Sequence, residues 1–339
     1  MEDFMGPAAA ALVGLLAGIP LGLAARLGRF CTLGAIEDQA YGNDAGRAWM
    51  WASALGAAIL GTGLLDLAGI VDVGTTAYRT VPWNPVASVL GGLVFGYGMA
   101  MAGNCGFGAL ARLGGGELRS FVIVVVIGLS ALIVLSGPLA HLRLLAFPPD
   151  RGLHLTGLPA WCALPIGTAL WLVGLWRAPR RAVWGTVAGL SIAAAWGGTS
   201  WLSQASFEAI RPASHTFSAP IGGFLLWLMT ASGNAPGFGT GSVAGVLVGA
   251  LAGSVGRGQF RWEACEDPRE LGRQIGGAAL MGAGAVVALG CSIGQGLSAF
   301  AVLAFSAPVT LAAIVIGARL GLRQLIEGRP PYALRGALD

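Results

Sequence analysis

Long apolar segments recur along almost the whole chain and are separated by short polar stretches. Many of them have 15 to 20 residues and lack the polar face that a helix of a soluble protein carries. Segments of this length are typical of helices that cross a lipid bilayer. We therefore predict an all-α polytopic membrane protein. The ten segments are 8–26, 46–65, 85–103, 120–141, 159–176, 182–203, 219–233, 243–256, 274–289 and 304–322.

Arginine residues orient these segments, because basic loops favour the cytoplasmic side of a membrane. The loop "RAPRR" at 177–181 is the strongest marker, and five apolar segments precede it, which places the N-terminus outside. The C-terminal tail carries four arginines between Arg319 and Arg335, which predicts that it lies inside. An odd number of crossings satisfies both conditions. We predict about nine transmembrane helices, with 182–203 as the segment that does not cross.

Glycine-rich stretches with turn-forming residues interrupt several apolar segments. Backbone N–H and C=O groups cannot face lipid unpaired, so each break must be buried in protein or line a path. Helices that begin in such breaks point their N–H groups inward, and these donors favour an anion. Close packing of small residues between helices is the alternative interpretation. The breaks are 31–34, 103–108, 233–241 and 290–296.

Two of the breaks align when Cys105 is set over Cys291, because glycines then coincide at several neighbouring positions. The order of apolar helix, cysteine, glycine-rich bend and apolar helix is also the same. This similarity predicts an inverted internal repeat, an arrangement common in transporters. The repeat belongs to a single membrane domain, 1–339, with short re-entrant helices at the breaks. Its halves are about 8–141 and 219–322, joined by 142–218.

Cysteine residues occur in three of the four breaks. A neutral thiol is a weak donor and a soft, polarizable acceptor, so it suits a sulfur-containing anion that must also be released. The alternative role is that of a small buried apolar residue, which we assign to Cys162, and we assign no role to Cys265. The candidate substrate-binding residues are Cys31, Cys105, Cys291, Gly106, Gly108, Asn104, Asn234, Gly237, Gly294 and Gln295.

Composition and charge exclude several other classes of protein. The chain is 55% hydrophobic and only 11% charged, whereas soluble domains carry about 25% charged residues. Its net charge of +4 comes from arginines in loops, so it indicates membrane topology and not a nucleic-acid partner. The five cysteines form no CxxC pair, and we expect neither a metal nor a cofactor. We expect His141, His154 and His215 to be solvated loop residues.

Three motifs carry a resemblance to a known family. The stretches "GRFCTLGAIED", "GMAMAGNCGFGALARLGGG" and "LGCSIGQGLSAF" resemble the YeeE/YedE family of bacterial inner-membrane thiosulfate transporters. The resemblance implies a pseudo-symmetric bundle with short helices that point into a waist. It also implies that Cys31, Cys105 and Cys291 pass thiosulfate inward through S–H contacts. A separate sulfur-carrier protein of the TusA type at the cytoplasmic face is the partner that it implies.

The resulting prediction is a membrane transporter, not an enzyme, that takes up a small sulfur oxyanion such as thiosulfate. The N-terminus is expected to be periplasmic and the C-terminus cytoplasmic. Three alternatives remain at this point. The first is the same architecture with another sulfur or selenium species as its substrate. The second is a membrane thiol oxidoreductase, against which the absence of a CxxC pair argues, and the third is a structural membrane subunit.

Overall fold

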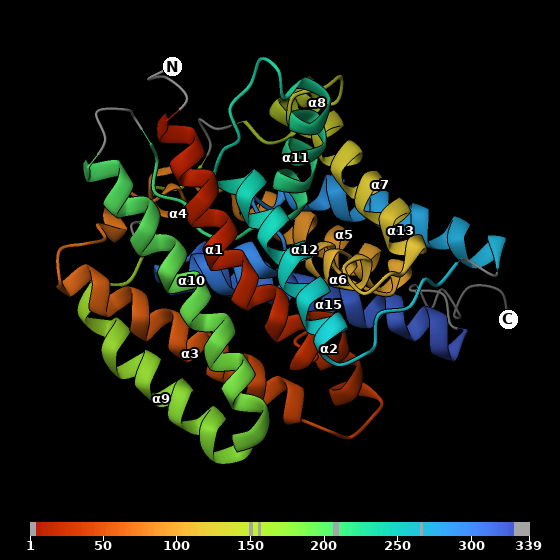
Figure 1. The fold of residues 1–339 in the computed structure, drawn as a ribbon, viewed down its shortest axis with the longest axis horizontal. Helices are drawn as coiled ribbons and strands as arrows, with labels where there is room; N and C mark the ends of the chain where they lie inside the picture. Colours follow the sequence, from red (N-terminus) through yellow and green to blue (C-terminus); the bar gives the residue numbers. More distant parts are fainter. Residues whose placement is uncertain (1–4, 149–151, 155–156, 206–209, 265–266, 329–339) are drawn as a thin grey trace, which may run out of the picture.

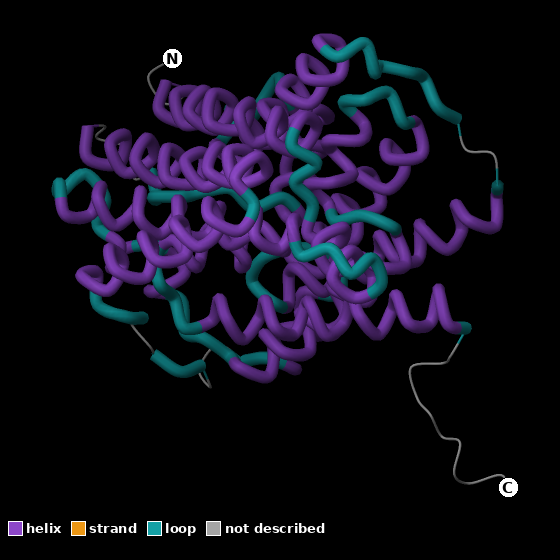
Figure 2. The backbone as a smooth tube through the Cα atoms, turned by 90° about the horizontal axis from the view of Figure 1, so that it is seen from below, coloured by secondary structure: helices purple, strands orange, loops and turns teal. Residues whose placement is uncertain are grey.

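The computed structural model describes residues 5–148, 152–154, 157–205, 210–264 and 267–328. These parts consist of helices, turns and loops and contain no strand (Figure 1, Figure 2). The predicted all-α fold is therefore confirmed. Among the described residues, six helical segments are long and apolar enough to cross a membrane, as expected of a multi-pass membrane protein. Cys265 lies outside the described residues.

The helices follow one another with mostly short connections. Residues Asn84 and Asp267 start two of them by accepting hydrogen bonds from backbone N–H groups of the first turn, with a proline next in sequence. In chain order the elements are α1 (Met5–Leu27), α2 (Thr32–Ala40), α3 (Gly46–Leu67), η2 (Val73–Thr75), α4 (Ala77–Thr80), α5 (Pro85–Ala102), α6 (Gly106–Leu113), α7 (Leu118–Leu135), α8 (Ala140–Ala146), η4 (Ala160–Cys162), α9 (Ala163–Arg177), α10 (Pro179–Ala205), α11 (Ser218–Thr230), α12 (Phe238–Gly256), α13 (Pro268–Val287), η5 (Gly294–Ser298), α14 (Ala299–Ala301) and α15 (Ser306–Glu327).

The long helices form two groups. In the first group α3 packs between α9 and α10, and α1 packs between α10 and α12. In the second group α5 packs between α13 and α15, and α7 packs against α13. Figure 1 shows α9 and α10 toward the left of the molecule and α7 and α13 toward the right.

Glycine residues allow the helices within each group to approach closely. A Cβ atom at Gly241 in α12 would overlap the carbonyl oxygen of Ala11 in α1. A Cβ atom at Gly96 in α5 would likewise overlap the carbonyl oxygen of Ile314 in α15. Small residues have this role in membrane helix pairs, where lipid gives no hydrophobic drive for association and close backbone packing supplies the attraction.

Two helices bear on the predicted topology. The helix α10 contains 27 residues without interruption, about 40 Å at 1.5 Å per residue, but it is not among the six segments that are both long and apolar enough to cross. The helix α11 has only 13 residues, fewer than the roughly 20 that a crossing requires. Both helices thus differ from the six candidate spans, α10 in composition and α11 in length, and the choice of 182–203 as the segment that does not cross stays a prediction. The number of nine crossings stays a prediction.

Four short helical segments lie between the two groups. The helix α2 contacts α3 and α15, and η5 with α14 contacts the same two long helices. On the other side, α6 and α11 both contact α7 and α12. Each short segment thus touches one long helix of each group, so the short segments occupy the middle of the molecule.

Candidate functional site

The residue directly before each of the four short helical segments is non-helical, and three of these four residues are cysteines. Cys31 and Cys105 have extended backbone conformations and directly precede α2 and α6. Cys291 directly precedes the helical turns that begin at Ser292 and include η5. Phe217 has the corresponding place before α11. Three of the four helix starts therefore carry a thiol.

The helix starts meet in the interior of the molecule. The backbone N–H of Phe217 donates to Sγ of Cys291 at 3.4 Å, which joins the starts of α11 and of the segment that contains η5. Cys105 and Cys291 belong to one buried cluster, and Cys31 packs against that cluster. The structure thus brings together three thiols that are separated by up to 260 positions in the sequence, from 31 to 291.

A row of aromatic rings passes through this centre. The ring of Phe107 lies between those of Phe30 and Phe217, with ring centroids 6.4 Å and 5.3 Å apart. The ring of Phe30 stacks on Trp51 at 4.8 Å. Phe30 and Phe107 lie within two positions of a thiol in the sequence, so the same helix starts that place the thiols also surround them with aromatic rings.

Backbone N–H groups donate to two of the thiols. Gly108 donates to Sγ of Cys105 at 3.4 Å, and Gly294 donates to Sγ of Cys291 at 3.5 Å. A sulfur that accepts these bonds keeps its own S–H proton for another acceptor. Both side chains are enclosed, with 1% of Cys105 and 2% of Cys291 exposed. The cysteines of the described residues are all free thiols.

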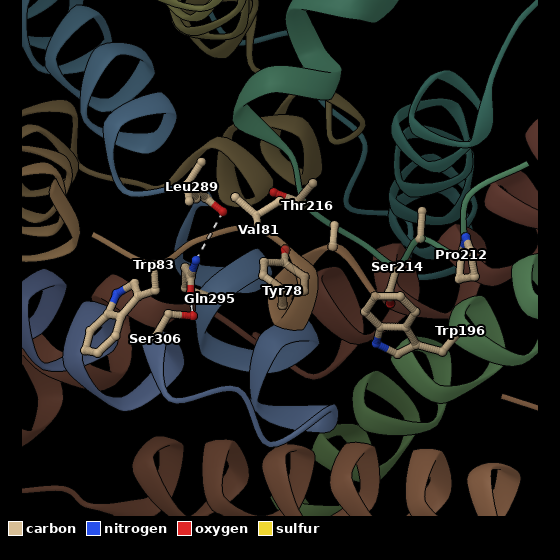
Figure 3. A pocket seen from close by; sticks show the side chains of 12 residues that line it. Tyr78, Val81, Trp83, Trp196, Pro212, Ser214, Thr216, Leu289, Gln295 and Ser306 are labelled. Atoms are coloured by element: carbon tan, nitrogen blue, oxygen red, sulfur yellow. Dashed lines mark hydrogen bonds between the residues drawn. The ribbon is translucent and has the colours of Figure 1, made fainter. Parts of the chain in front are cut away.

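A cavity of about 250 Å³ lies beside the stretch that precedes α11 and the segment that contains η5 (Figure 3). Its wall includes Thr216, whose hydroxyl lies 3.6 Å from Sγ of Cys291. A Cβ atom at Gly294 would lie 2.6 Å from the Thr216 hydroxyl oxygen, so glycine is needed there for this approach. No charged side chain lines the described wall. We call this space the neutral cavity; it is lined by Ala77, Tyr78, Val81, Trp83, Trp196, Pro212, Ala213, Ser214, Thr216, Leu289, Gln295 and Ser306.

A second cavity, of about 360 Å³, includes Cys31 in its wall. Four arginines line it against a single carboxylate, that of Glu37. Arg47, one of the four, forms an ion pair with Asp38 at 3.1 Å. The surplus of guanidinium groups favours an anion in this space. We call it the arginine cavity; it is lined by Ala25, Arg26, Arg29, Phe30, Cys31, Leu33, Gly34, Glu37, Arg47, Gly103, Gly108, Ala111, Arg112 and Gln259.

Comparison with known proteins gives this arrangement a family. Residues 27–320 match the sulphur transport family, a region that includes all three thiols. The chain belongs to the sulphur transport family. The resemblance carried by its cysteine motifs is thereby confirmed.

Two curated relatives of this chain are both named thiosulfate transporter TsuA. The thiosulfate transporter TsuA of Escherichia coli (strain K12) is 25% identical over 339 aligned residues, which cover 90% of this chain and 92% of the relative. The thiosulfate transporter TsuA of Spirochaeta thermophila is 25% identical over 334 residues, covering 90% of this chain and 96% of the relative. Both likenesses therefore extend over nearly the full length of each protein.

Most of the residues predicted to bind substrate lie at the centre of this sulphur transport protein. Gln295 is 1% exposed, and its side-chain amide donates to the carbonyl oxygens of Ala288 and Leu289 at 3.1 Å each. Asn104 is also 1% exposed, and its Oδ1 has no hydrogen-bond partner in the described structure. The predicted residues in or next to the four helix starts are Cys31, Asn104, Cys105, Gly106, Gly108, Cys291, Gly294 and Gln295.

The structure does not bring Asn234 and Gly237 to the thiols. Asn234 is exposed in the turn after α11, where its amide donates to the Thr230 hydroxyl at 2.9 Å. Gly237 directly precedes α12, and a Cβ atom there would have open space around it. The break therefore consists of a turn at 233–237, exposed at Asn234, and of 238–241, which begin α12. The fourth helix start follows the extended stretch 213–217 instead, which contains neither cysteine nor glycine.

The sequence analysis missed the role of His215. This side chain is fully buried, not solvated: its Nδ1 lies 2.6 Å from the Ser242 hydroxyl, and its Nε2 lies 3.4 Å from the Ser191 hydroxyl. Its ring is parallel to that of Phe217, which donates to Cys291. His215 thus fixes the stretch before α11 to α10 and α12. Its partners lie 24 and 27 positions away in the sequence, so nothing in the local stretch "PASHTFSAP" indicated this packing.

Replacing His215 with alanine is expected to lower the free energy of unfolding by about 2 kcal/mol, because the buried Ser242 hydroxyl loses its partner and the buried ring leaves a cavity. Thermal unfolding of the purified protein in detergent measures the effect. His141→Ala is the matched control, because His141 is exposed. Equal midpoints for the two variants would contradict the structural role of His215.

Proposed function

We propose that this protein takes up a small sulfur oxyanion, thiosulfate, across the bacterial inner membrane by passing it along three thiols. The observation that supports the proposal is the position of the thiols between two cavities of different character. Cys291 adjoins the neutral cavity through Thr216, and Cys31 lines the arginine cavity. Cys105 accepts a hydrogen bond from Gly108, which lines the arginine cavity together with Cys31. The names of the two relatives favour thiosulfate as the substrate.

The proposed path begins in the neutral cavity and ends in the arginine cavity. Neutral hydroxyl and amide groups hold an anion weakly, which permits release toward the thiols. Each thiol then offers an S–H donor and a polarizable sulfur to the terminal sulfur of the anion. Because Cys105 and Cys291 are almost fully enclosed, passage requires the short helices to move apart briefly. The arginines at the end of the path attract the anion away from the centre.

The distribution of basic residues supports the proposed direction of transport, from the neutral cavity to the arginine cavity. Basic residues favour the cytoplasmic side, and the arginine cavity is the basic one of the two. The helix α1 ends at this cavity, which supports a periplasmic position for its beginning. Tyr41, after α2, donates to Glu327 at the end of α15 at 3.2 Å, which supports a cytoplasmic position for the end of α15.

Helix packing supports the proposed inverted repeat with shifted boundaries. The packing of α1 against α12 has a counterpart in the packing of α10 against α3. The packing of α5 against α15 has a counterpart in the packing of α13 against α7. This correspondence matches α1, α3, α5 and α7 with α10, α12, α13 and α15 in the same order. The second half then begins at Pro179, earlier than the boundary at 219 expected from the glycine pattern. The helix α11 becomes the counterpart of α2.

Two further parts of the proposal concern the partner and the cargo. The arginine cavity opens on the proposed cytoplasmic face, where a separate TusA-like sulfur-carrier protein would receive the sulfur. Another sulfur or selenium oxyanion fits the same donors, because thiols respond to the polarizability of the terminal atom.

Uptake of ³⁵S-labelled thiosulfate into proteoliposomes tests the proposal. Vesicles that contain the parent protein are expected to accumulate label above protein-free vesicles. Unlabelled thiosulfate and selenosulfate should compete, whereas phosphate should not. Accumulation no greater than in protein-free vesicles would contradict the proposal. Chemical conversion of thiosulfate without accumulation would identify a thiol oxidoreductase instead.

A further inference from the structure

Three buried hydroxyl groups occupy the same position in three of the four short helical segments. Thr32, Ser218 and Ser292 are each the first helical residue, and they directly follow Cys31, Phe217 and Cys291. They are 4%, 1% and 0% exposed, respectively. The fourth segment, α6, has Gly106 at this position. We call Thr32, Ser218 and Ser292 the hydroxyl set.

The side-chain oxygens of the hydroxyl set have no hydrogen-bond partner in the described structure. Several buried hydroxyls within long helices do have a partner: Thr310 donates to the carbonyl oxygen of Ser306, and Ser254 donates to that of Ala250, both at 2.8 Å. A residue at the start of a helix has no carbonyl group of its own helix four positions earlier. Its hydroxyl therefore stays available to a ligand.

Two hydroxyls of the set, those of Ser292 and Ser218, lie near the start of α6, which carries the central thiol. The Ser292 hydroxyl lies near Cys105, without the geometry of a hydrogen bond. The Ser218 hydroxyl oxygen lies 3.8 Å from where a Cβ atom of Gly106 would be, and Gly106 directly follows Cys105. Thr32 directly follows Cys31, which packs against the buried cluster that contains Cys105. A Cβ atom at Gly106 would also be in ordinary contact with Ile221 and Ile127, so the glycine leaves room beside the Ser218 hydroxyl.

We infer that Thr32, Ser218 and Ser292 bind the oxygen atoms of the permeating anion, while the thiols contact its terminal sulfur. This inference rests on the proposed function and assigns the residues that recognise the oxyanion end of the substrate. Thiosulfate has three oxygens beside its terminal sulfur, and the hydroxyl set supplies three neutral O–H donors. No arginine lies among these groups, so the anion is not held by a full charge and leaves readily.

Removing a hydroxyl of the set is expected to weaken substrate binding without loss of stability. For Ser292→Ala and Ser218→Ala, the KM of thiosulfate uptake should rise on the order of tenfold, the effect of losing one hydrogen bond to a charged group. Their thermal midpoints in detergent should not fall, because the hydroxyl has no protein partner to lose. Ser200→Ala is the matched control: Ser200 is buried and unpartnered in the described structure, but it lines a different cavity. Its KM should stay within twofold of the parent value.

Sulfate separates recognition of oxygen from recognition of sulfur, because it has the oxygens of thiosulfate without the terminal sulfur. In Ser292→Ala, the inhibition constant of sulfate should rise by the same factor as the KM for thiosulfate. In Cys105→Ala, the KM for thiosulfate should rise while the inhibition constant of sulfate stays constant. An unchanged KM in both serine variants would overturn the inference, as would a rise of the same size in Ser200→Ala.

Binding in detergent distinguishes a failure of this inference from a failure of the proposed function. Sulfate, compared with chloride at equal ionic strength, should raise the thermal midpoint of the parent and of Ser200→Ala but not of Ser292→Ala. This result supports the binding of anion oxygens by the hydroxyl set even if the parent takes up no thiosulfate. Equal shifts in the three proteins, or no shift in any of them, would overturn it.

Discussion

Replacing Cys291 with alanine is expected to reduce the initial rate of thiosulfate uptake by at least about tenfold. The thiol accepts hydrogen bonds from the N–H groups of Phe217 and Gly294, so its S–H remains for the substrate. Alanine removes both the donor and the polarizable sulfur. Cys105→Ala should have the same effect, because Gly108, which donates to Cys105, lines the arginine cavity together with Cys31. The measurement is ³⁵S uptake at a thiosulfate concentration below KM.

Two further variants make this prediction specific. Cys162→Ala is the control, since Cys162 lies at the start of α9 and packs against Ile59 and Leu303, away from the three thiols. Its uptake should equal that of the parent. Cys291→Ser keeps an O–H donor and should retain part of the flux, whereas a dithiol enzyme would lose all turnover. Parental uptake in both Cys105→Ala and Cys291→Ala would refute the relay along the thiols.

Replacing Gly241 with alanine is expected to destabilise the protein by about 3 kcal/mol, near the upper end of the destabilisation that overpacking a core site causes. The added Cβ atom would overlap the backbone carbonyl oxygen of Ala11, and a rigid helix backbone cannot move aside as a flexible side chain can. The helices α1 and α12 would have to separate along their whole contact. The thermal midpoint in detergent should fall, and the monodisperse fraction on size exclusion should decrease.

The control for this prediction is Gly276→Ala in α13. A Cβ atom at Gly276 would meet nothing within 4 Å, and alanine has a higher helix propensity than glycine. Its midpoint should therefore equal or exceed that of the parent. Equal midpoints for Gly241→Ala and Gly276→Ala would show that α1 and α12 do not pack as closely as described.

The sequence predicted the parts of the site whose signals are local. Cys31, Cys105 and Cys291 each directly precede a short helix, and glycine-rich composition marks such breaks within a few positions. The all-α fold followed from segment length and the lack of polar faces. These properties depend on neighbouring residues, so one sequence was sufficient to find them.

The fourth helix start could not be predicted in the same way. The stretch before α11 is held by distant groups: Thr199 accepts from the N–H of Ala213, and Ser298 donates to the carbonyl oxygen of His215. Nothing within the stretch itself resembles the three cysteine breaks. The glycines at 233–241 matched the expected composition, so the break was predicted at the turn 233–237 and the first residues of α12. The burial of His215 also depends on such long-range contacts.

The proposed transport requires that the anion pass directly beside the thiols. A crystal structure with selenosulfate, recorded at the selenium absorption edge, tests this passage most directly, because anomalous scattering locates the terminal atom of the anion. We predict a selenium peak in contact with Sγ of Cys105 or Cys291. Selenium only in the arginine cavity or at the surface, with none beside a thiol, would contradict the account.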